Sequence, residues 1–233
     1  MCLYYCIITT KNMISIVMPI YNGIEFVDES VKSIISQTFT SWELVIGING
    51  HPENSEVYKI AKKYESEDSR IKVYDFPKIK GKANTLNEMI TLCKYDYVSL
   101  LDVDDVWSPY KLQKQTDVIA SSNGLYDVIG SRCIYIGDMN GVVPKLPTGD
   151  ITQFDFFKFN PMINSSMVMR KELCNWDEHA GVEDYDLWLK LWKSGKLFYN
   201  CEQILVKHRI HKSSAFNSQG NHLKVADLLK KYR

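Results

Sequence analysis

Apolar and polar positions follow two alternating patterns along the first half of the chain. Residues 14–20, ISIVMPI, form a continuous apolar and β-branched run, which is typical of a strand buried on both faces. From residue 24 to residue 37 the apolar positions instead recur at helical spacing. The alternation then repeats, which predicts strands over residues 42–48, 71–76 and 95–101 and helices over residues 53–64 and 81–94.

These strand–helix alternations predict an α/β fold with a mostly parallel, doubly wound sheet, because parallel strands need crossover connections and helices provide them. In such sheets a ligand binds beyond the carboxyl ends of the strands. The first, second and fourth predicted strands end near Tyr21, Asn49 and Asp102. We therefore expect these three residues to border one crevice.

The second half of the chain, after Pro109, has a mixed pattern, and we expect its strands to be mixed in direction. A hairpin turn is predicted at residues 139–141, Met-Asn-Gly. The other predicted elements are a helix to about residue 122, strands over residues 127–136, 166–170, 196–199 and 204–210, and helices over residues 182–194 and up to residue 233.

Composition narrows the classes of function. Lysine and arginine total 28 residues, as do aspartate and glutamate, so no overall charge favours nucleic acid as a partner. The six cysteines are scattered without a CxxC pair, which indicates reduced thiols rather than a zinc site or a disulfide framework. No apolar run approaches the roughly 20 residues of a membrane span. We expect a cytoplasmic protein without a transmembrane segment, and loose attachment to a membrane surface stays open.

Three carboxylates follow the apolar run YVSLL, in the sequence Asp102-Val103-Asp104-Asp105. They repel one another, and at the end of a buried strand they are costly unless a cation or hydrogen-bond donors neutralise them. Hard ions such as Mg²⁺ bind through one or two carboxylates together with substrate phosphate oxygens. A solvated acidic loop that caps the next helix is the alternative. The position at a strand end favours the binding site.

A second acidic pair, Glu183-Asp184, opens the helix predicted over residues 182–194. Acids at a helix start complement the helix dipole and cap free N–H groups, so a purely structural role is one interpretation. A carboxylate held there is also suited to act as a general base toward a hydroxyl. The spacing leaves both interpretations open.

Basic and imidazole side chains gather in two further places. Strand alternation puts Arg209 and His211 on one face of the last predicted strand and His208 on the other. A neutral imidazole can ligate a metal, and a guanidinium can hold a diphosphate. Lys82 and Asn84 lie at the start of a predicted helix, where N–H groups also suit phosphate. A GxxxxGK[ST] loop does not occur, so the sequence does not favour a P-loop hydrolase.

Four motifs together resemble the family 2 glycosyltransferases of GT-A fold, from about residue 13 to residue 215. They are Pro19-Ile20-Tyr21-Asn22, Leu101-Asp102-Val103-Asp104-Asp105, Glu183-Asp184-Tyr185-Asp186-Leu187-Trp188 and Arg209-Ile210-His211. The resemblance implies an inverting enzyme that takes a nucleotide-diphosphate sugar as donor and uses Mn²⁺ or Mg²⁺. It would act as a hexosyl- or N-acetylhexosaminyltransferase toward a hydroxyl of a glycan, protein or lipid-linked acceptor.

The resemblance also divides the chain. Residues 1–12 would be an N-terminal extension, residues 13–108 the nucleotide-sugar-binding half, and residues 109–233 the mixed, acceptor-binding half of the same domain. Phe154 to Asn164 would border the acceptor groove.

Roles follow position by position from the same resemblance. Asp104 would bind the metal, with His211 as a further candidate ligand. Asp184 would be the general base, with Glu183 as its orienting neighbour or as the next candidate for the base. The residues expected to contact the donor are Pro19 and Tyr21 at the nucleobase, Asp102 at the ribose, and Asn49, Lys82, Asn84, Val103 and Arg209.

One loop departs from the family's pattern. Family members commonly carry Asp-Asp-Gly-Ser after the second strand, whereas this chain has Gly47-Ile48-Asn49-Gly50-His51-Pro52. The Asn49 amide oxygen can still accept the N3–H of uracil. A UDP-sugar is therefore the favoured donor, and guanine and thymine nucleotides stay open.

Two alternatives remain at this stage. The altered loop would also suit a catalytically silent GT-A domain that binds a sugar nucleotide or a partner protein. A sugar nucleotidyltransferase shares the nucleotide-binding sheet and acidic metal site, but it would leave Glu183-Asp184 and Arg209-Ile210-His211 without a role.

Overall fold

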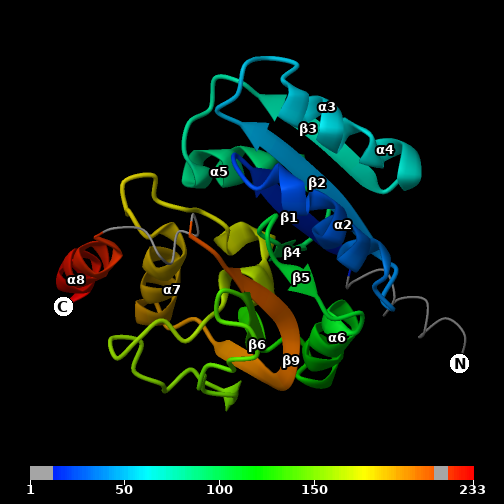
Figure 1. Ribbon diagram of the computed structural model, residues 1–233. Coiled ribbons are helices and arrows are strands. Elements are labelled where there is room, and N and C mark those ends of the chain that lie inside the picture. The colour runs from blue at the N-terminus through cyan, green and yellow to red at the C-terminus, as the bar shows by residue number, and fades with distance from the viewer. Residues whose placement is uncertain (1–12, 213–219) are drawn as a thin grey trace, which may run out of the picture.

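The computed structural model describes residues 13–212 and 220–233, so the predicted extension over residues 1–12 lies outside the described residues. One sheet of nine strands runs through this part of the chain, in the order β3-β2-β1-β4-β8-β6-β9-β5, with β7 paired to β9 (Figure 1). Its strands are β1 (Ile14–Ile20), β2 (Trp42–Asn49), β3 (Ile71–Phe76), β4 (Tyr97–Leu100), β5 (Val106–Trp107), β6 (Val128–Gly137), β7 (Gly149–Asp150), β8 (Val168–Arg170) and β9 (Phe198–Ile210).

The first four strands form the predicted parallel half. β1 pairs in parallel with β2 and β4, and β2 pairs in parallel with β3. Helices or short helical turns connect them, as right-handed crossovers require. These connections are η1 (Ile24–Phe26) and α2 (Val27–Ile35), α3 (Glu56–Lys62) and α4 (Tyr64–Glu67), and α5 (Lys82–Leu92). The predicted α/β class and the doubly wound parallel sheet are confirmed.

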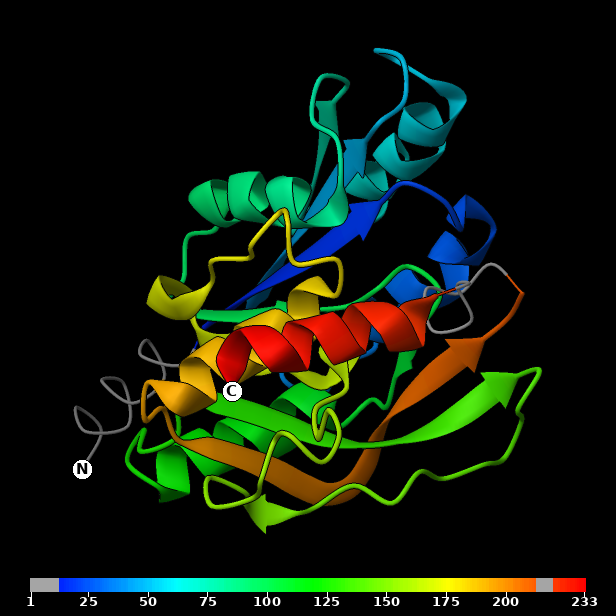
Figure 2. The ribbon, with the colours of Figure 1, turned by 90° about the vertical axis from the view of Figure 1, so that its left-hand side faces the viewer.

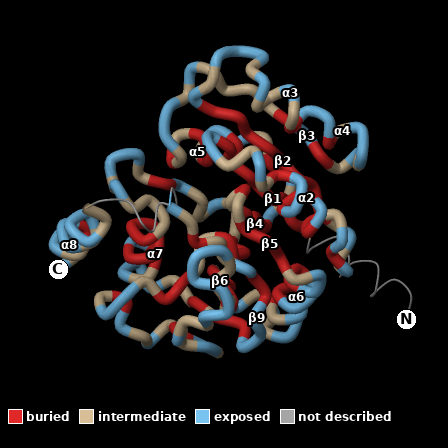
Figure 3. The backbone as a smooth tube through the Cα atoms, in the orientation of Figure 1, coloured by how far each residue is buried: buried red, intermediate tan, exposed pale blue. Residues whose placement is uncertain are grey.

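Alternate residues of the central strands pack against opposite layers. Ile16 and Met18 of β1 lie in the core beneath α2, where Val31 is fully buried. Val17 faces the other core, which α5 covers. In Figure 3 the central strands are coloured mostly as buried, and the outer faces of the helices are coloured as exposed. Burial on both faces explains why β1 is apolar at every position except Ser15.

The second half is mixed, as predicted. β8 pairs antiparallel with β4 and β6, whereas β6 and β9 run parallel and β5 pairs antiparallel with β9. The remaining elements are α6 (Lys111–Ser121), η2 (Asn164–Ser166), η3 (Lys171–Leu173), α7 (Glu183–Lys193) and α8 (Asn221–Tyr232). The same sheet therefore carries both halves of the predicted domain.

One strand prediction in this half was wrong, and the predicted turn forms without a returning strand. The strands expected over residues 196–199 and 204–210 form one 13-residue strand, β9, because irregular pairing near Arg132 of β6 lets β9 pass without a break. The turn predicted at residues 139–141 does form, since Tyr135 N donates to Val142 O at 2.8 Å and Gly141 N donates to Tyr135 O at 2.9 Å, but no strand continues from it over residues 142–148. The returning segment contains Pro144 and Pro147, which lack the N–H that a strand ladder needs.

Helix α8 lies across α7 near the C-terminus (Figure 2). Lys231 Nζ is 3.0 Å from Asp186 Oδ1 of α7, and the Tyr232 hydroxyl donates to the same oxygen at 2.9 Å. Asp186 is buried, so these contacts supply the partners that a buried carboxylate needs. They also fix the first turn of α7, where Glu183 and Asp184 lie.

Among the described residues, no helix is both long enough and apolar enough to cross a membrane. The four cysteines in this part of the chain, Cys93, Cys133, Cys174 and Cys201, are free thiols.

Candidate active site

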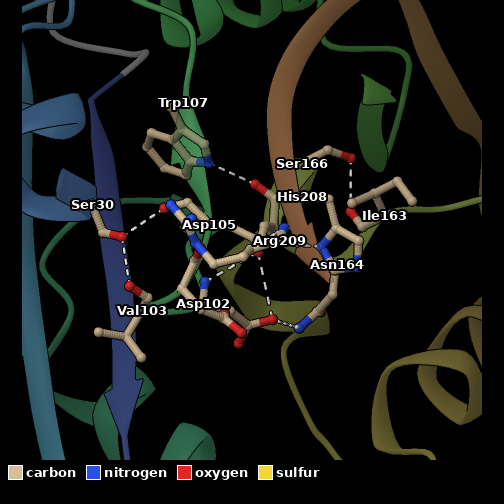
Figure 4. Close-up of polar contacts among 12 residues, drawn as sticks. Ser30, Asp102, Val103, Asp105, Trp107, Ile163, Asn164, Ser166, His208 and Arg209 are labelled. Carbon is tan, nitrogen blue, oxygen red and sulfur yellow. Dashed lines mark hydrogen bonds and ion pairs between the residues drawn. The ribbon is translucent and has the colours of Figure 1, made fainter. Parts of the chain in front are cut away.

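The acidic turn after β4 is held by its own backbone and by α2. Asp105 N donates to Asp102 O at 3.0 Å, which closes the turn. The hydroxyl of Ser30 in α2 lies 2.6 Å from both Val103 O and Asp105 O (Figure 4). Val103 is buried, and a Cβ on Gly23 would come within 3.0 Å of its side chain. Because main-chain contacts fix the turn, the carboxylates are left to bind other groups.

Asp105 is the buried anchor of this turn. Its side chain accepts hydrogen bonds from His208 Nδ1 at 2.9 Å and from Arg209 N at 2.7 Å, and the residue is fully buried. Burial opposes the charged imidazolium, but the Asp105 carboxylate raises the pKa of His208 to about 9. Asp105 therefore ties β9 to the end of β4.

Asp104 faces the predicted partner His211. Asp104 Oδ2 lies 2.9 Å from His211 Nε2, and each side chain is about one quarter exposed. Burial, and then the neighbouring carboxylates Asp105 and Asp102, raise the pKa of Asp104. The rings of Phe26 and His211 are 5.4 Å apart, and the Arg209 guanidinium lies 4.7 Å from the same Phe26 ring. Arg209 and His211 thus share one face of the chain, as strand alternation predicted.

Arg209 is already engaged by the protein. Its Nε donates to Asp104 O at 2.8 Å, and its guanidinium pairs with Glu29 of α2. Arg209 therefore braces the acidic turn against α2, which is a positioning contact that strand alternation did not predict.

Lys82 joins the acidic turn to α7. From the first position of α5, its Nζ lies 2.6 Å from Asp102 Oδ1 and 3.5 Å from Glu183 Oε1. Burial opposes the charged ammonium, yet the attraction of Asp102, Glu183 and Asp184 raises the pKa of Lys82. The two acidic motifs, 81 residues apart in the sequence when counted from Asp102 to Glu183, therefore meet at one lysine.

Asp102 also forms hydrogen bonds with Asn164 and Ser165 on the opposite side. Asn164 Nδ2 donates to Asp102 Oδ2 at 3.2 Å, as Figure 4 shows, and Asp102 N donates to Ser165 Oγ at 3.1 Å. Burial alone would raise the pKa of Asp102, but Lys82 and Asn164 lower it below its usual value. Asp102 is therefore held as a carboxylate.

Asp184 has a different environment. It lies in the first turn of α7, and Asn160 Nδ2 donates to its Oδ2 at 3.4 Å. Burial, and then the adjacent Glu183 carboxylate, raise the pKa of Asp184 to about 6. A carboxyl group with a pKa near neutral can exchange a proton with a ligand at physiological pH.

The residues at Asp104 fit a divalent cation only in part. No group of three or more His, Cys, Asp or Glu side chains suited to a metal occurs within residues 13–212 and 220–233. Asp104 and His211 do converge, and one carboxylate plus one imidazole is a sufficient protein contribution when phosphate oxygens complete the shell. The pair suits an ion that arrives with a diphosphate.

The predicted nucleobase end lies at β1 and β2. Tyr21 is 56% exposed, and a Cβ on Gly50 would come within 2.8 Å of its ring. His51 Nε2 donates to Tyr21 O at 2.6 Å. Asn49 and Pro19 are buried at the strand ends. An exposed aromatic ring lying over a glycine offers a flat surface on which a base can stack.

Some predicted residues do not join this cluster, and some that do were not predicted. Asn84 donates to Glu178 and to Lys80 O, so its amide faces the outer side of α5. Asn160 and Asn164 were both expected at the acceptor groove, and no contact with Asp184 or Asp102 was predicted for either. The Asn160-Pro161 pair is a turn signal in the sequence, but nothing in its spacing indicates Asp184 as a partner.

Comparison with known proteins gives a consistent picture. The family described as Glycosyl transferase family 2 matches residues 15–175. Over 220 residues the chain is 29% identical to an Escherichia coli protein named UDP-Glc:alpha-D-GlcNAc-diphosphoundecaprenol beta-1,3-glucosyltransferase WfgD, covering 91% of this chain and 83% of that protein. It is also 28% identical over 210 residues to an uncharacterized glycosyltransferase of Methanocaldococcus jannaschii, covering 86% and 71% of the two chains.

Solved structures share the fold at low sequence identity. The S. aureus protein TarS, crystallised as residues 1–349 with UDP-GlcNAc, aligns with a TM-score of 0.75 at 15% identity, covering 94% of this chain and 66% of that one. The mannosyltransferase PcManGT from Pyrobaculum calidifontis, in complex with GDP-Man and Mn²⁺, aligns with a TM-score of 0.68 at 12% identity, covering 92% and 66%. This chain therefore spans about two thirds of each of these two structures.

Proposed function

The chain belongs to Glycosyl transferase family 2, and from this premise we propose that it is an inverting, metal-dependent glycosyltransferase with Asp184 as its general base. Family membership makes it a glycosyltransferase that uses a nucleotide-sugar donor. It also disfavours the alternative of a sugar nucleotidyltransferase. The proposal adds the stereochemistry, the metal and the residues.

One observation carries the proposal, namely the contact of Lys82 with both Asp102 and Glu183. This contact brings the turn that carries Asp102 next to the first turn of α7, which carries Asp184. The proposed ribose ligand and the proposed base therefore lie in a single site. Asp102 accepts hydrogen bonds from the ribose hydroxyls of the donor. Asp184 accepts the proton of the acceptor hydroxyl as that oxygen attacks the anomeric carbon, while the bond from that carbon to the nucleotide diphosphate breaks.

The cation site proposed at Asp104 and His211 completes the charge balance. Asp104 and His211 would hold a divalent cation, which would supply positive charge to offset that of the diphosphate. Arg209, fixed by Glu29 and by Asp104 O, keeps the turn that carries Asp104 in place.

We favour a UDP-sugar as the donor and a hexosyl or N-acetylhexosaminyl group as the transferred sugar. The printed name of the E. coli relative gives UDP-Glc as its donor, and TarS was crystallised with UDP-GlcNAc. PcManGT binds GDP-Man, so guanosine is the competing base. The base would stack on Tyr21, and the buried Asn49 would accept the N3–H of uracil.

The acceptor would bind in the second half of the chain, over residues 109–233, with the donor in residues 13–108. Its hydroxyl belongs to a glycan, a protein or a lipid-linked sugar. Support comes from the position of Asn160 beside Asp184, since Asn160 lies in the segment from Phe154 to Asn164 that was expected to border this groove.

The experiment measures release of nucleoside diphosphate from a panel of UDP-, GDP- and dTDP-sugars, with Mn²⁺ and with a chelator. We expect turnover with one donor in Mn²⁺ and its loss in the chelator. The Asp102→Asn variant should lose affinity for that donor, since a ribose contact is removed. Binding of a donor without turnover across candidate acceptors would instead support a catalytically silent domain.

A further inference from the structure

Residues 160–165 touch both acidic motifs at once. Asn160 Nδ2 lies 3.4 Å from Asp184 Oδ2, and Asn164 Nδ2 lies 3.2 Å from Asp102 Oδ2. Two asparagines four residues apart thus donate to two carboxylates that belong to different elements. Both carboxylates have roles in the proposed reaction, as ribose ligand and as general base, and the two asparagines are their neutral partners.

The Asn160 amide has a defined orientation. Its Oδ1 accepts a hydrogen bond from Met162 N at 3.1 Å, which directs the amide nitrogen toward Asp184. A side chain whose oxygen closes a local turn loses its freedom to flip. The Asn160 amide therefore presents its N–H group, and not its carbonyl oxygen, to Asp184.

The turn that carries Asn160 is fixed to the paired strands β6 and β9. Asn200 of β9 is fully buried and donates to Pro161 O at 3.0 Å. Met162 is 2% exposed, and a Cβ on Gly130 of β6 would come within 2.6 Å of its methyl group. Because Gly130 leaves room for Met162, the turn packs directly on the sheet.

Charged groups approach Asp184 from three directions. Glu183 precedes it on α7, Lys82 approaches from α5, and Asp102 approaches from the turn after β4. Asn160 is the neutral donor from a fourth element. A hydrogen bond donated to a carboxylate favours its charged form, which is the form a base needs before it takes a proton.

We propose that Asn160 is a positioning residue for Asp184, holding its carboxylate in one orientation and in the charged state until the acceptor hydroxyl delivers its proton. This inference rests on the proposed role of Asp184 as base. Asn160 itself exchanges no proton and forms no bond to the sugar.

The test compares Asn160→Ala and Asn160→Asp with the unmodified enzyme in the pH dependence of kcat. Loss of the N–H donor raises the pKa of Asp184, so the acidic limb of the profile moves to higher pH in Asn160→Ala. Asn160→Asp keeps an oxygen for Met162 N but puts a carboxylate against Asp184, so it moves the limb further. For a rise of about one unit in the pKa of Asp184, we expect kcat at pH 7 to fall about twofold in Asn160→Ala, less than the roughly 10²–10⁴-fold loss expected for a missing base.

Asn164→Ala is the matched control. It removes the same amide from the same segment, but on the side of Asp102, so it should raise the donor KM and leave the acidic limb in place. An equal shift of the limb in Asn164→Ala would overturn the specific role of Asn160, as would an unshifted limb in both Asn160 variants.

A second readout separates this inference from the proposed function. The titration of the Asp184 carboxyl carbon, followed by ¹³C NMR, needs no turnover. A raised pKa of Asp184 in Asn160→Ala supports the positioning contact. This holds even if Asp184→Asn keeps its activity, a result that would refute only the role of Asp184 as base. An unchanged titration with a catalytically dead Asp184→Asn refutes Asn160 and leaves the base standing.

Discussion

Carboxylates at the carboxyl end of the sheet lie in two different surroundings. In the turn after β4, Asp102 faces Lys82, Asp104 faces His211, and Asp105 faces His208. At the start of α7, Asp184 instead faces the neutral amide of Asn160 and the carboxylate of Glu183. The pKa of Asp102 is lowered as a result, and that of Asp184 is raised to about 6.

The difference shows how one residue type can supply two functions. Asp102, paired with the ammonium of Lys82, keeps its charge, which suits the binding of a ribose, whereas burial and the neighbouring carboxylates raise the pKa of Asp104. A buried carboxylate beside another carboxylate takes up a proton near neutral pH, which suits a general base. Pairs of acids whose surroundings push their pKa values apart are a recurrent sign of divided roles.

The largest effect is expected from removing the proton acceptor. Asp184→Asn should lower kcat by roughly 10²–10⁴-fold, because the amide cannot take the proton of the acceptor hydroxyl. Donor affinity, measured by calorimetry, should stay within about twofold. Glu183→Gln is the control on the same helix turn. A large loss of kcat in Glu183→Gln, with near-normal kcat in Asp184→Asn, would make Glu183 the base and Asp184 its orienting neighbour.

The next effect is expected on the requirement for metal. Asp104→Asn or His211→Ala should raise the Mn²⁺ concentration for half-maximal turnover by roughly 10–100-fold, since each removes one of the two proposed protein ligands. Titration of activity with Mn²⁺ measures it. Asp102→Asn should leave this requirement unchanged. If it is Asp102→Asn that shifts the Mn²⁺ titration, the division of roles within the turn is wrong.

The smallest effect concerns stability and belongs to the buried anchor. His208 has a pKa of about 9 in the folded protein and 6.5 as the ordinary value. Its raised pKa stabilises the fold fully below pH 6.5, and the stabilisation is lost as the pH rises to about 9. The free energy of unfolding should therefore fall across this window by on the order of 2–3 kcal/mol.

Urea unfolding at a series of pH values measures this loss. The His208→Gln variant should be less stable at pH 6.5 and should show a flatter profile between pH 6.5 and pH 9. Parallel profiles for the variant and the unmodified protein would show that Asp105 does not hold His208 in its charged form.

Elements with strong local signals could be predicted from the sequence. β1 and β2 are buried on both faces and read as apolar runs, and the helices between them repeat apolar positions at helical spacing. Asp102 and Asp104 were found because acids directly after such a run need an explanation. Asp184 was assigned as the base only through the resemblance, since an acid at a helix start is equally well explained as a cap.

Contacts that depend on tertiary approach could not be predicted. Lys82 was expected to meet phosphate, and its approach to both Asp102 and Glu183 follows from where α5 and α7 pack. Asn160 reaches Asp184 only because Asn200 and Gly130, in other strands, fix its turn. The unbroken β9 likewise depends on a pairing irregularity in its neighbour.

The distance along the chain between Asp105 and His208 has a consequence during synthesis. His208 follows Asp105 by 103 residues, and His211 follows Asp104 by 107. At translation rates of about 5–20 residues per second, the acidic turn leaves the ribosome roughly 5–20 s before its imidazole partners exist. During that interval the nascent parallel half carries its acids without these counter-charges, so the last-made strand, β9, completes the site.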